Sequence, residues 1–315
     1  MSQKHTRLIG KLKSELGSII IQALEDPAAV EIMLNPDGTL WVEKHGSAME
    51  HVGEMSALNA ESLIGTIADT LNTTVTPDSP ILEGELPIDG SRFEGLIPPI
   101  VGKPTFTIRK KSSVLLTFDD YVNQGVMTEN QKSSLVDAVL NHKNVLVCGG
   151  AGSGKTTFTN AVIDNISEQF ESERLVIIED TVEIQARSKN SVALRTSINV
   201  NMMMLLKATM RLRPDRILVG EVRGQEALAL LKSWNTGHSG GVATIHANSA
   251  LAGLIRLEQL VSESSEASSM SMRPLIAEAV DLVVMIKRTG EGRKISELLS
   301  VERLDDQGEY VFSYL

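Results

Sequence analysis

A glycine-rich stretch near the middle of the chain, Gly149 to Thr157, reads GGAGSGKTT. It matches the phosphate-binding pattern G-x-x-x-x-G-K-[ST], and it stands between the apolar run NVLVC and a helix-compatible segment, as that pattern requires. Glycines let backbone N–H groups curl around phosphates, the lysine reaches the β- and γ-phosphates, and the threonine hydroxyl binds Mg²⁺. We therefore expect ATP and Mg²⁺ as ligands. The predicted nucleotide-binding residues are Gly150, Ala151, Gly152, Ser153, Gly154, Lys155, Thr156 and Thr157.

Around this loop, apolar runs of strand length alternate with amphipathic stretches. The runs are NVLVC, RLVIIED, RILVGE and GGVATIHA, with helical segments after Lys155, near 202–210 and at 225–234. Strands that are apolar on both faces and alternate with helices predict an α/β fold with a parallel sheet. The final segments DLVVMIKR, RKISELLSV and EYVFSYL predict antiparallel strands at the sheet edge.

The first third of the chain has a different pattern. Apolar residues recur at helical spacing over 6–23, which favours a helix that packs on a core over one that lies on a membrane surface. Turn residues then separate strand-like runs, and a second helix is expected at 57–71. We expect a smaller α+β domain at 1–110, a linker at 111–131 and an ATPase domain at 132–315.

Two acidic segments end predicted parallel strands, where ligands bind in open α/β sheets. The first carries Glu179 and Asp180, and the second ends in Glu221. Either could orient a water or hold Mg²⁺ through water, although a solvated turn is the alternative for the first pair. Gly220 occupies the position where such a strand usually carries a magnesium-binding Asp.

Histidine and arginine residues complete the candidate site. His246 follows another strand, and a hydrogen bond to the terminal phosphate is favoured over a metal site or a core histidine. Arg92 and Arg109 stand in the N-terminal third, from which an arginine could reach a phosphate. Other arginines with that potential are Arg211, Arg213, Arg216 and Arg223.

Composition excludes several classes. A net charge of −10 argues against a protein whose main task is to wrap nucleic acid, and we expect no sequence-specific nucleic-acid binding. The single Cys148 excludes an internal disulfide and a four-cysteine zinc site. Because no apolar stretch reaches the roughly 20 residues that cross a bilayer, we expect a cytoplasmic protein whose membrane contact is peripheral.

These motifs together resemble those of the secretion and traffic ATPases, the RecA-like motors of type IV secretion, type II secretion and type IV pili. The matching segments are GAGSGKTT, IEDTVEI, RPDRILVGEVRG and TGHSGGVATIHANS, in that order. The resemblance covers nearly the whole chain, more loosely in its N-terminal third, and favours the conjugal-transfer branch. Members of the type II and pilus branches usually carry a four-cysteine zinc insertion, and retraction motors carry an AIRHxG-like segment that is absent from this sequence.

The resemblance implies a two-domain subunit with a RecA-like P-loop domain, which assembles as a homo-hexamer with inner-membrane secretion or conjugation proteins. It implies that Glu179 and Glu221 prepare the water and that His246 couples the γ-phosphate to motion. Lys155 and Thr156 would bind phosphate and Mg²⁺. Arg92 and Arg109 would meet the nucleotide as the domains close. A nucleic-acid translocase and a scaffold that binds ATP without hydrolysis remain as alternatives.

Overall fold

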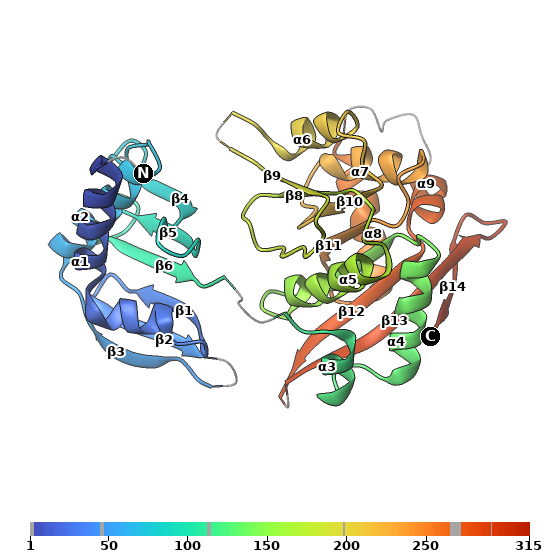
Figure 1. The fold of residues 1–315 in the computed structure, drawn as a ribbon, viewed down its shortest axis with the longest axis horizontal. Coiled ribbons are helices and arrows are strands. Elements are labelled where there is room, and N and C mark those ends of the chain that lie inside the picture. The colour runs from blue at the N-terminus through green and yellow to red at the C-terminus, as the bar shows by residue number, and fades with distance from the viewer. Residues whose placement is uncertain (1–2, 45–46, 112–114, 198, 265–271, 291) are drawn as a thin grey trace. The chain divides into compact units, whose positions relative to one another are not determined.

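The computed structural model describes residues 3–44, 47–111, 115–197, 199–264, 272–290 and 292–315 of the 315-residue chain. The chain divides into two compact units, residues 1–113 and residues 114–315 (Figure 1). Among the described helices, none combines the length and the apolar character needed to cross a membrane.

The first unit is an antiparallel sheet with helices on one face. The strand order is β3-β2-β1-β6-β5-β4, and each neighbouring pair of these described strands is antiparallel. Helices α1 (Gln3–Glu25) and α2 (Ala57–Thr70) supply apolar side chains to a common core with the sheet. The strands are β1 (Ala29–Leu34), β2 (Thr39–Lys44), β3 (Glu50–Glu54), β4 (Ile81–Glu85), β5 (Arg92–Leu96) and β6 (Thr105–Arg109).

Helix α1 packs as its periodicity predicted. Leu12, Leu16 and Ile20 are buried and lie in the core that includes the sheet residues Ile32 and Phe93. Gly17 interrupts the helix with φ 70°, a left-handed conformation that favours glycine, so α1 is kinked where we expected a continuous helix. The burial of Leu12, Leu16 and Ile20 confirms the prediction that this helix packs on a core.

The second unit contains an eight-stranded sheet in the order β14-β13-β12-β7-β11-β10-β8-β9. Its middle strands are parallel, and the β12–β13 and β13–β14 pairs are antiparallel. We predicted that the last three strands are antiparallel, which is correct for their pairing with one another. The prediction did not include the parallel pairing of β12 with β7. The strands are β7 (Val145–Gly149), β8 (Leu175–Glu179), β9 (Ser191–Arg195), β10 (Arg216–Val219), β11 (Val242–His246), β12 (Leu282–Thr289), β13 (Gly292–Leu304) and β14 (Tyr310–Tyr314).

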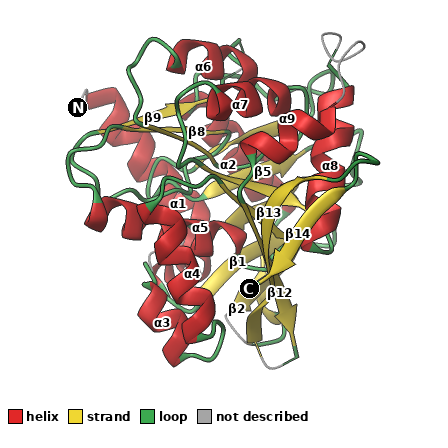
Figure 2. Cartoon of the chain, turned by 90° about the vertical axis from the view of Figure 1, so that its right-hand side faces the viewer, coloured by secondary structure: helices red, strands yellow, loops and turns green. Residues whose placement is uncertain are grey.

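Helices cover both faces of this sheet, as Figure 2 shows. One core contains residues of α3 (Phe118–Asn123), α4 (Glu129–Leu140) and α5 (Lys155–Gln169). The other contains residues of α6 (Met202–Thr209), α7 (Glu226–Asn235), α8 (Ala250–Ser262) and α9 (Met272–Ala279). Phe118 and Tyr121 of α3, within the expected linker, are buried in the first of these cores. The fold is the predicted α/β domain preceded by a smaller α+β unit.

Candidate ATPase site

The glycine-rich loop joins the end of β7 to the start of α5 in the second unit. Gly152 and Gly154 have φ values of 64° and 96°, which L side chains rarely adopt, and Gly154 is the N-cap of α5. A β-carbon on Gly149 would lie 2.4 Å from Ser153 Oγ and 2.6 Å from the carbonyl oxygen of Ile286. The glycines are therefore required both for backbone conformation and for close packing.

Lys155 is held inside this loop. Its Nζ donates to the carbonyl oxygens of Gly149 (3.0 Å) and Gly150 (2.9 Å), and it lies 3.4 Å from Nδ1 of His246. Burial lowers the pKa of Lys155, and the nearby Glu221 carboxylate opposes that effect. Ser153 Oγ is buried without a hydrogen-bond partner. A buried ammonium, an unsatisfied hydroxyl and the start of a helix suit a phosphate group.

Glu221 follows β10 and is held between two basic groups. Its Oε1 lies 3.0 Å from Nε2 of His246, and its Oε2 accepts a hydrogen bond of 2.6 Å from Nη2 of Arg223. The second guanidinium nitrogen of Arg223 is 3.6 Å from Oδ2 of Asp180. The sequence places Glu221 and Arg223 together after the strand and makes Arg223 a candidate phosphate contact; the structure adds the hydrogen bond between them. The available signal was the spacing E-x-R, which places Glu221 and Arg223 two positions apart directly after the strand.

His246 is the last residue of β11. Burial lowers its pKa, Lys155 lowers it further, and Glu221 raises it. The net lowering favours a neutral imidazole, which can both donate and accept a hydrogen bond. The structure thus brings His246, Lys155 and Glu221 together at one sheet edge, as the sequence predicted.

Glu179 ends β8 and is buried. Its Oε1 accepts hydrogen bonds from the backbone N–H groups of Glu183 (3.0 Å) and Ile184 (2.8 Å). This oxygen therefore shapes the segment after β8. Asn160 on α5 fixes the same segment, since its Oδ1 accepts from the N–H of Gln185 at 3.0 Å.

The glycine at position 220 has a packing explanation. A β-carbon on Gly220 would lie 2.9 Å from Cγ and 3.4 Å from Oε1 of Glu179. Strands β8 and β10 are parallel neighbours, and Val219 pairs with Ile178 one position earlier. The Glu179 side chain thus occupies the space that an Asp at 220 would need. The carboxylate at this position of the sheet edge is therefore that of Glu179, from the adjacent strand β8.

Arg92 and Arg109 belong to the first unit, where they lie side by side. They are directly paired across β5 and β6, and Arg109 Nε is 3.4 Å from Oε1 of Glu31. Because they are in the other unit, their contact with a nucleotide stays a prediction.

Arg216, another of the candidate arginines, lies in the interior of the second unit. Its side chain is fully buried at the start of β10, 2.5 Å from Oε2 of Glu173. Its guanidinium also stacks 4.7 Å from the ring centre of Phe170. With its charge satisfied by these groups, Arg216 stabilises the sheet.

Thr156 and Thr157 are half-buried in the first turn of α5. In the described part of the chain, no three His, Cys, Asp or Glu residues gather closely enough to hold a metal ion. Mg²⁺ needs no such group, because it keeps several waters and binds through phosphates and one or two protein oxygens. The donor set of Thr156 and the carboxylates Glu179 and Glu221 fits that chemistry.

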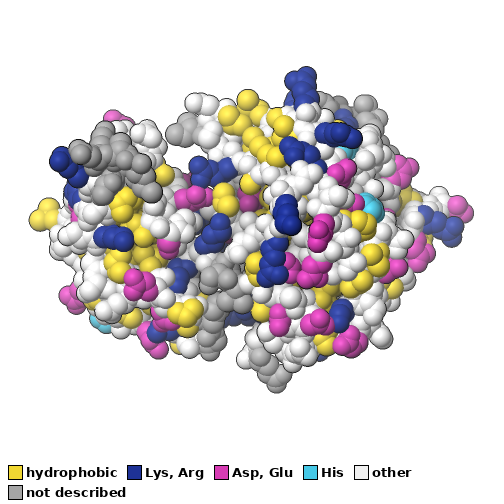
Figure 3. Space-filling model, viewed as in Figure 1, with side chains coloured by type: hydrophobic (Ala, Val, Ile, Leu, Met, Phe, Trp, Pro, Cys, Tyr) yellow, Lys and Arg dark blue, Asp and Glu magenta, His cyan; other side chains and the backbone are white. Residues whose placement is uncertain are grey.

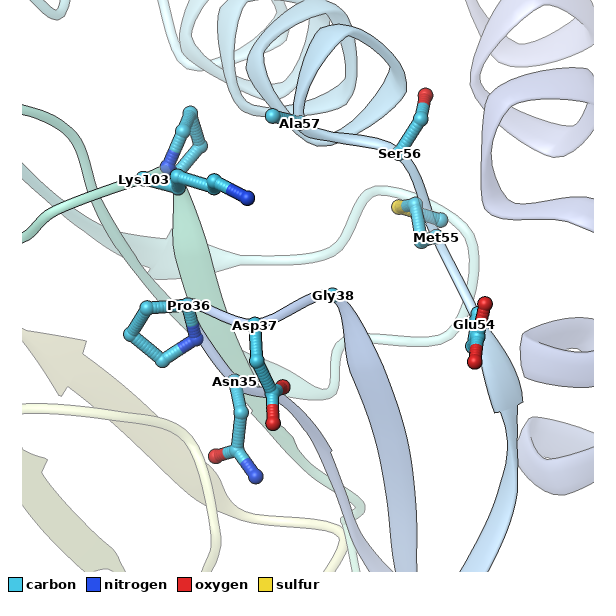
Figure 4. A pocket seen from close by; sticks show the side chains of 10 residues that line it. Asn35, Pro36, Asp37, Gly38, Glu54, Met55, Ser56, Ala57 and Lys103 are labelled. Carbon is cyan, nitrogen blue, oxygen red and sulfur yellow. The ribbon is translucent and has the colours of Figure 1, made fainter.

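A separate pocket of about 430 Å³ lies entirely in the first unit (Figure 4). It is formed by the β1–β2 turn, the segment between β3 and α2, and residues 103–104. Asp37 in its lining accepts hydrogen bonds from the N–H and Oγ1 of Thr39 at 2.9 and 2.7 Å. That carboxylate thus stabilises the turn, and none of the predicted site residues lines the pocket.

Comparison with known proteins identifies the family. The model of the "Type II/IV secretion system protein" family matches residues 16–295. The chain belongs to this family.

Relatives of this family align along most of the chain. A conjugal transfer protein TrbB from Rhizobium radiobacter is 52% identical over 300 residues, covering 95% of this chain and 92% of the relative. VirB11 of Agrobacterium fabrum is 30% identical over 328 residues, covering 93% and 94%. The crystal structure of the VirB11 ATPase from the Brucella suis type IV secretion system matches with a TM-score of 0.50 and 27% identity, covering 94% and 96%. The predicted class, an ATP hydrolase of the type II/IV secretion family, is confirmed.

Proposed function

We propose that this chain is one subunit of a homo-hexameric motor that hydrolyses ATP to power conjugal transfer or type IV secretion. The observation that carries the proposal is the group formed by Lys155, Glu221 and His246 beside the phosphate loop. Similarity to TrbB and VirB11 proteins over more than nine-tenths of the chain supports the conjugal and type IV systems. We further propose that the motor works at the cytoplasmic face of the inner membrane, bound to membrane proteins of that machinery.

In the proposed reaction, a water oxygen attacks the γ-phosphorus and the bond to the bridging oxygen breaks, which releases ADP. Lys155 and the loop N–H groups bind the phosphates. Glu221 orients the water and takes up its proton, while Arg223 and His246 hold the two carboxylate oxygens. Mg²⁺, when bound, neutralises charge on the phosphate oxygens, and Thr156 would hold it together with waters on Glu179 and Glu221. Arg92 and Arg109 would contact the nucleotide from the first unit.

His246 is proposed to report the state of the γ-phosphate. Nδ1 of this imidazole lies 3.4 Å from Lys155 Nζ and Nε2 lies 3.0 Å from Glu221 Oε1, so a change at the phosphate would alter the contacts of a residue that belongs to β11. Nucleotide binding would then bias a two-state domain movement.

Phosphate release and native mass measurement, each with and without ATP·Mg²⁺, test the proposal. We expect hydrolysis by a six-subunit particle, with loss of nucleotide binding in Lys155→Ala and loss of turnover alone in Glu221→Gln. Tight ATP binding without phosphate release, even with partner proteins and membranes present, would instead indicate a scaffold.

A nucleic-acid translocase would show phosphate release that DNA stimulates many-fold and that salt suppresses. Figure 3 speaks against that alternative, because basic and acidic side chains are interspersed on the face in view. Complementation of a conjugation-deficient strain would separate conjugal transfer from a pilus or type II secretion role.

A further inference from the structure

The β12–β13 hairpin lies directly beside the phosphate loop. Strand β12 is the parallel neighbour of β7, with Met285 paired to Cys148. The next residue, Ile286, places its carbonyl oxygen 2.6 Å from where a β-carbon on Gly149 would lie. Because β12 continues to Thr289 while β7 ends at Gly149, the hairpin extends beyond the carboxyl edge of the sheet, where the loop begins.

One hairpin side chain contacts the loop itself. A β-carbon on Gly154 would lie 2.8 Å from Cδ and 2.9 Å from Nε of Arg293, so this side chain packs on the N-cap residue of α5. Arg293 is exposed, and its charge reaches inward, since it opposes the rise in the pKa of Tyr121 that burial causes. The Arg293 side chain therefore places a positive charge beside Gly154 of the phosphate loop.

The hairpin concentrates positive charge at this point. Arg293 is paired across the strands with Arg288, and the adjacent pair is Lys287 with Lys294. Like charges in directly opposed positions destabilise a sheet. Lys287 is neutralised by Glu297, 3.1 Å away. An apolar side chain could cover Gly154 equally well, so the charge of Arg293 itself needs an explanation.

We infer that Arg293 is a nucleotide-binding residue that supplies a second cation, in addition to Lys155, to the polyphosphate of bound ATP or ADP. The inference rests on the proposed function, because it requires the loop to bind nucleotide. Backbone N–H groups of such loops hold the α- and β-phosphates, which ADP and ATP share. Arg293 therefore contributes to the affinity for both nucleotides and leaves the chemical step to Glu221.

Nucleotide titration of the full chain tests this role. Arg293→Met places Sδ and Cε where Cδ and Nε of Arg293 pack on Gly154, and it removes the charge. We expect its Kd for ADP and for ATP·Mg²⁺ to rise by about tenfold to a hundredfold, the usual value of a hydrogen bond to a charged group. The KM for ATP in phosphate release should rise with the Kd. Arg293→Lys should recover part of the affinity.

Lys294→Met is the matched control. It removes one positive charge from the adjacent position, whose side chain leaves the opposite face of the strand. Its Kd should stay within about twofold of the unchanged protein. Equal weakening in both variants would mean a general field effect and would overturn the assignment, as would unchanged affinity in Arg293→Met.

Lys155→Ala separates the two levels of the proposal. If it loses nucleotide while Arg293→Met does not, the nucleotide site stands and only the inference about Arg293 is wrong. If Lys155→Ala binds ADP like the unchanged protein, the proposed function itself fails. A thermal midpoint close to that of the unchanged protein confirms that each variant is folded. If Arg293→Met is not folded, the nucleotide affinities of Arg293→Lys and Lys294→Met are compared instead, and the assignment of Arg293 requires that Arg293→Lys binds more weakly than Lys294→Met.

Discussion

Replacing Gly220 with Asp tests whether Glu179 occupies the place of the usual magnesium-binding acid. The new β-carbon would lie 2.9 Å from Glu179 Cγ, and that side chain is held by two backbone N–H groups. It can move aside only by giving up those hydrogen bonds, each with a net value of about 1 kcal/mol. Two carboxylates about 4 Å apart also repel by about 4 kcal/mol at an effective dielectric constant near 20.

We therefore expect Gly220→Asp to lower the free energy of unfolding of the second unit by about 4 kcal/mol or more. For a domain of its size this corresponds to a fall in thermal midpoint of roughly 8–16 °C. Gly220→Ala, which adds the contact without the charge, should cost about 1–3 kcal/mol. Scanning calorimetry gives the midpoints, and a phosphate-release assay below them gives the activity.

Gly102→Asp makes the same chemical change at a glycine where a β-carbon would meet nothing within 4 Å. Its midpoint should stay near that of the unchanged protein. The reasoning is refuted if Gly220→Asp keeps both the original midpoint and the original rate of phosphate release, because position 220 would then accept an acid beside Glu179.

The remaining predictions concern catalysis, pH and the buried arginine. Glu221→Gln should reduce phosphate release by about a hundredfold or more while ATP binding persists; an unchanged rate contradicts the mechanism. Because the pKa of His246 is lowered from 6.5, the folded state binds fewer protons than the unfolded chain just below that pH, and stability falls as pH falls. His246→Gln should flatten this part of the curve of thermal midpoint against pH. Arg216→Met leaves the half-buried Glu173 with His142, 2.7 Å away, but without its 2.5 Å partner, and should cost up to about 3 kcal/mol in calorimetry; an unchanged midpoint would show that the pair is dispensable.

Local patterns in the sequence were sufficient for the fold class and most elements. Apolar runs of strand length identified β7, β8, β10 and β11, since a strand buried on both faces must be apolar throughout. Strand β9 was missed because it lies at the sheet edge and alternates between exposed and half-buried residues. The parallel pairing of β12 with β7 was also missed, since strand order depends on contacts between distant segments.

The sequence by itself determined the chemistry of the site. The glycine-rich loop, Glu221 and His246 were identifiable because each follows a recognisable strand, and parallel strands place their carboxyl ends at one edge. Only the tertiary structure decided how groups far apart in the chain pack: Arg293 against Gly154, and Glu179 over Gly220. Those contacts depend on interatomic distances of about 3 Å between neighbouring strands and hairpins. No periodicity along the chain encodes them, and so the reason for the glycine at 220 became apparent only when β8 and β10 lay side by side.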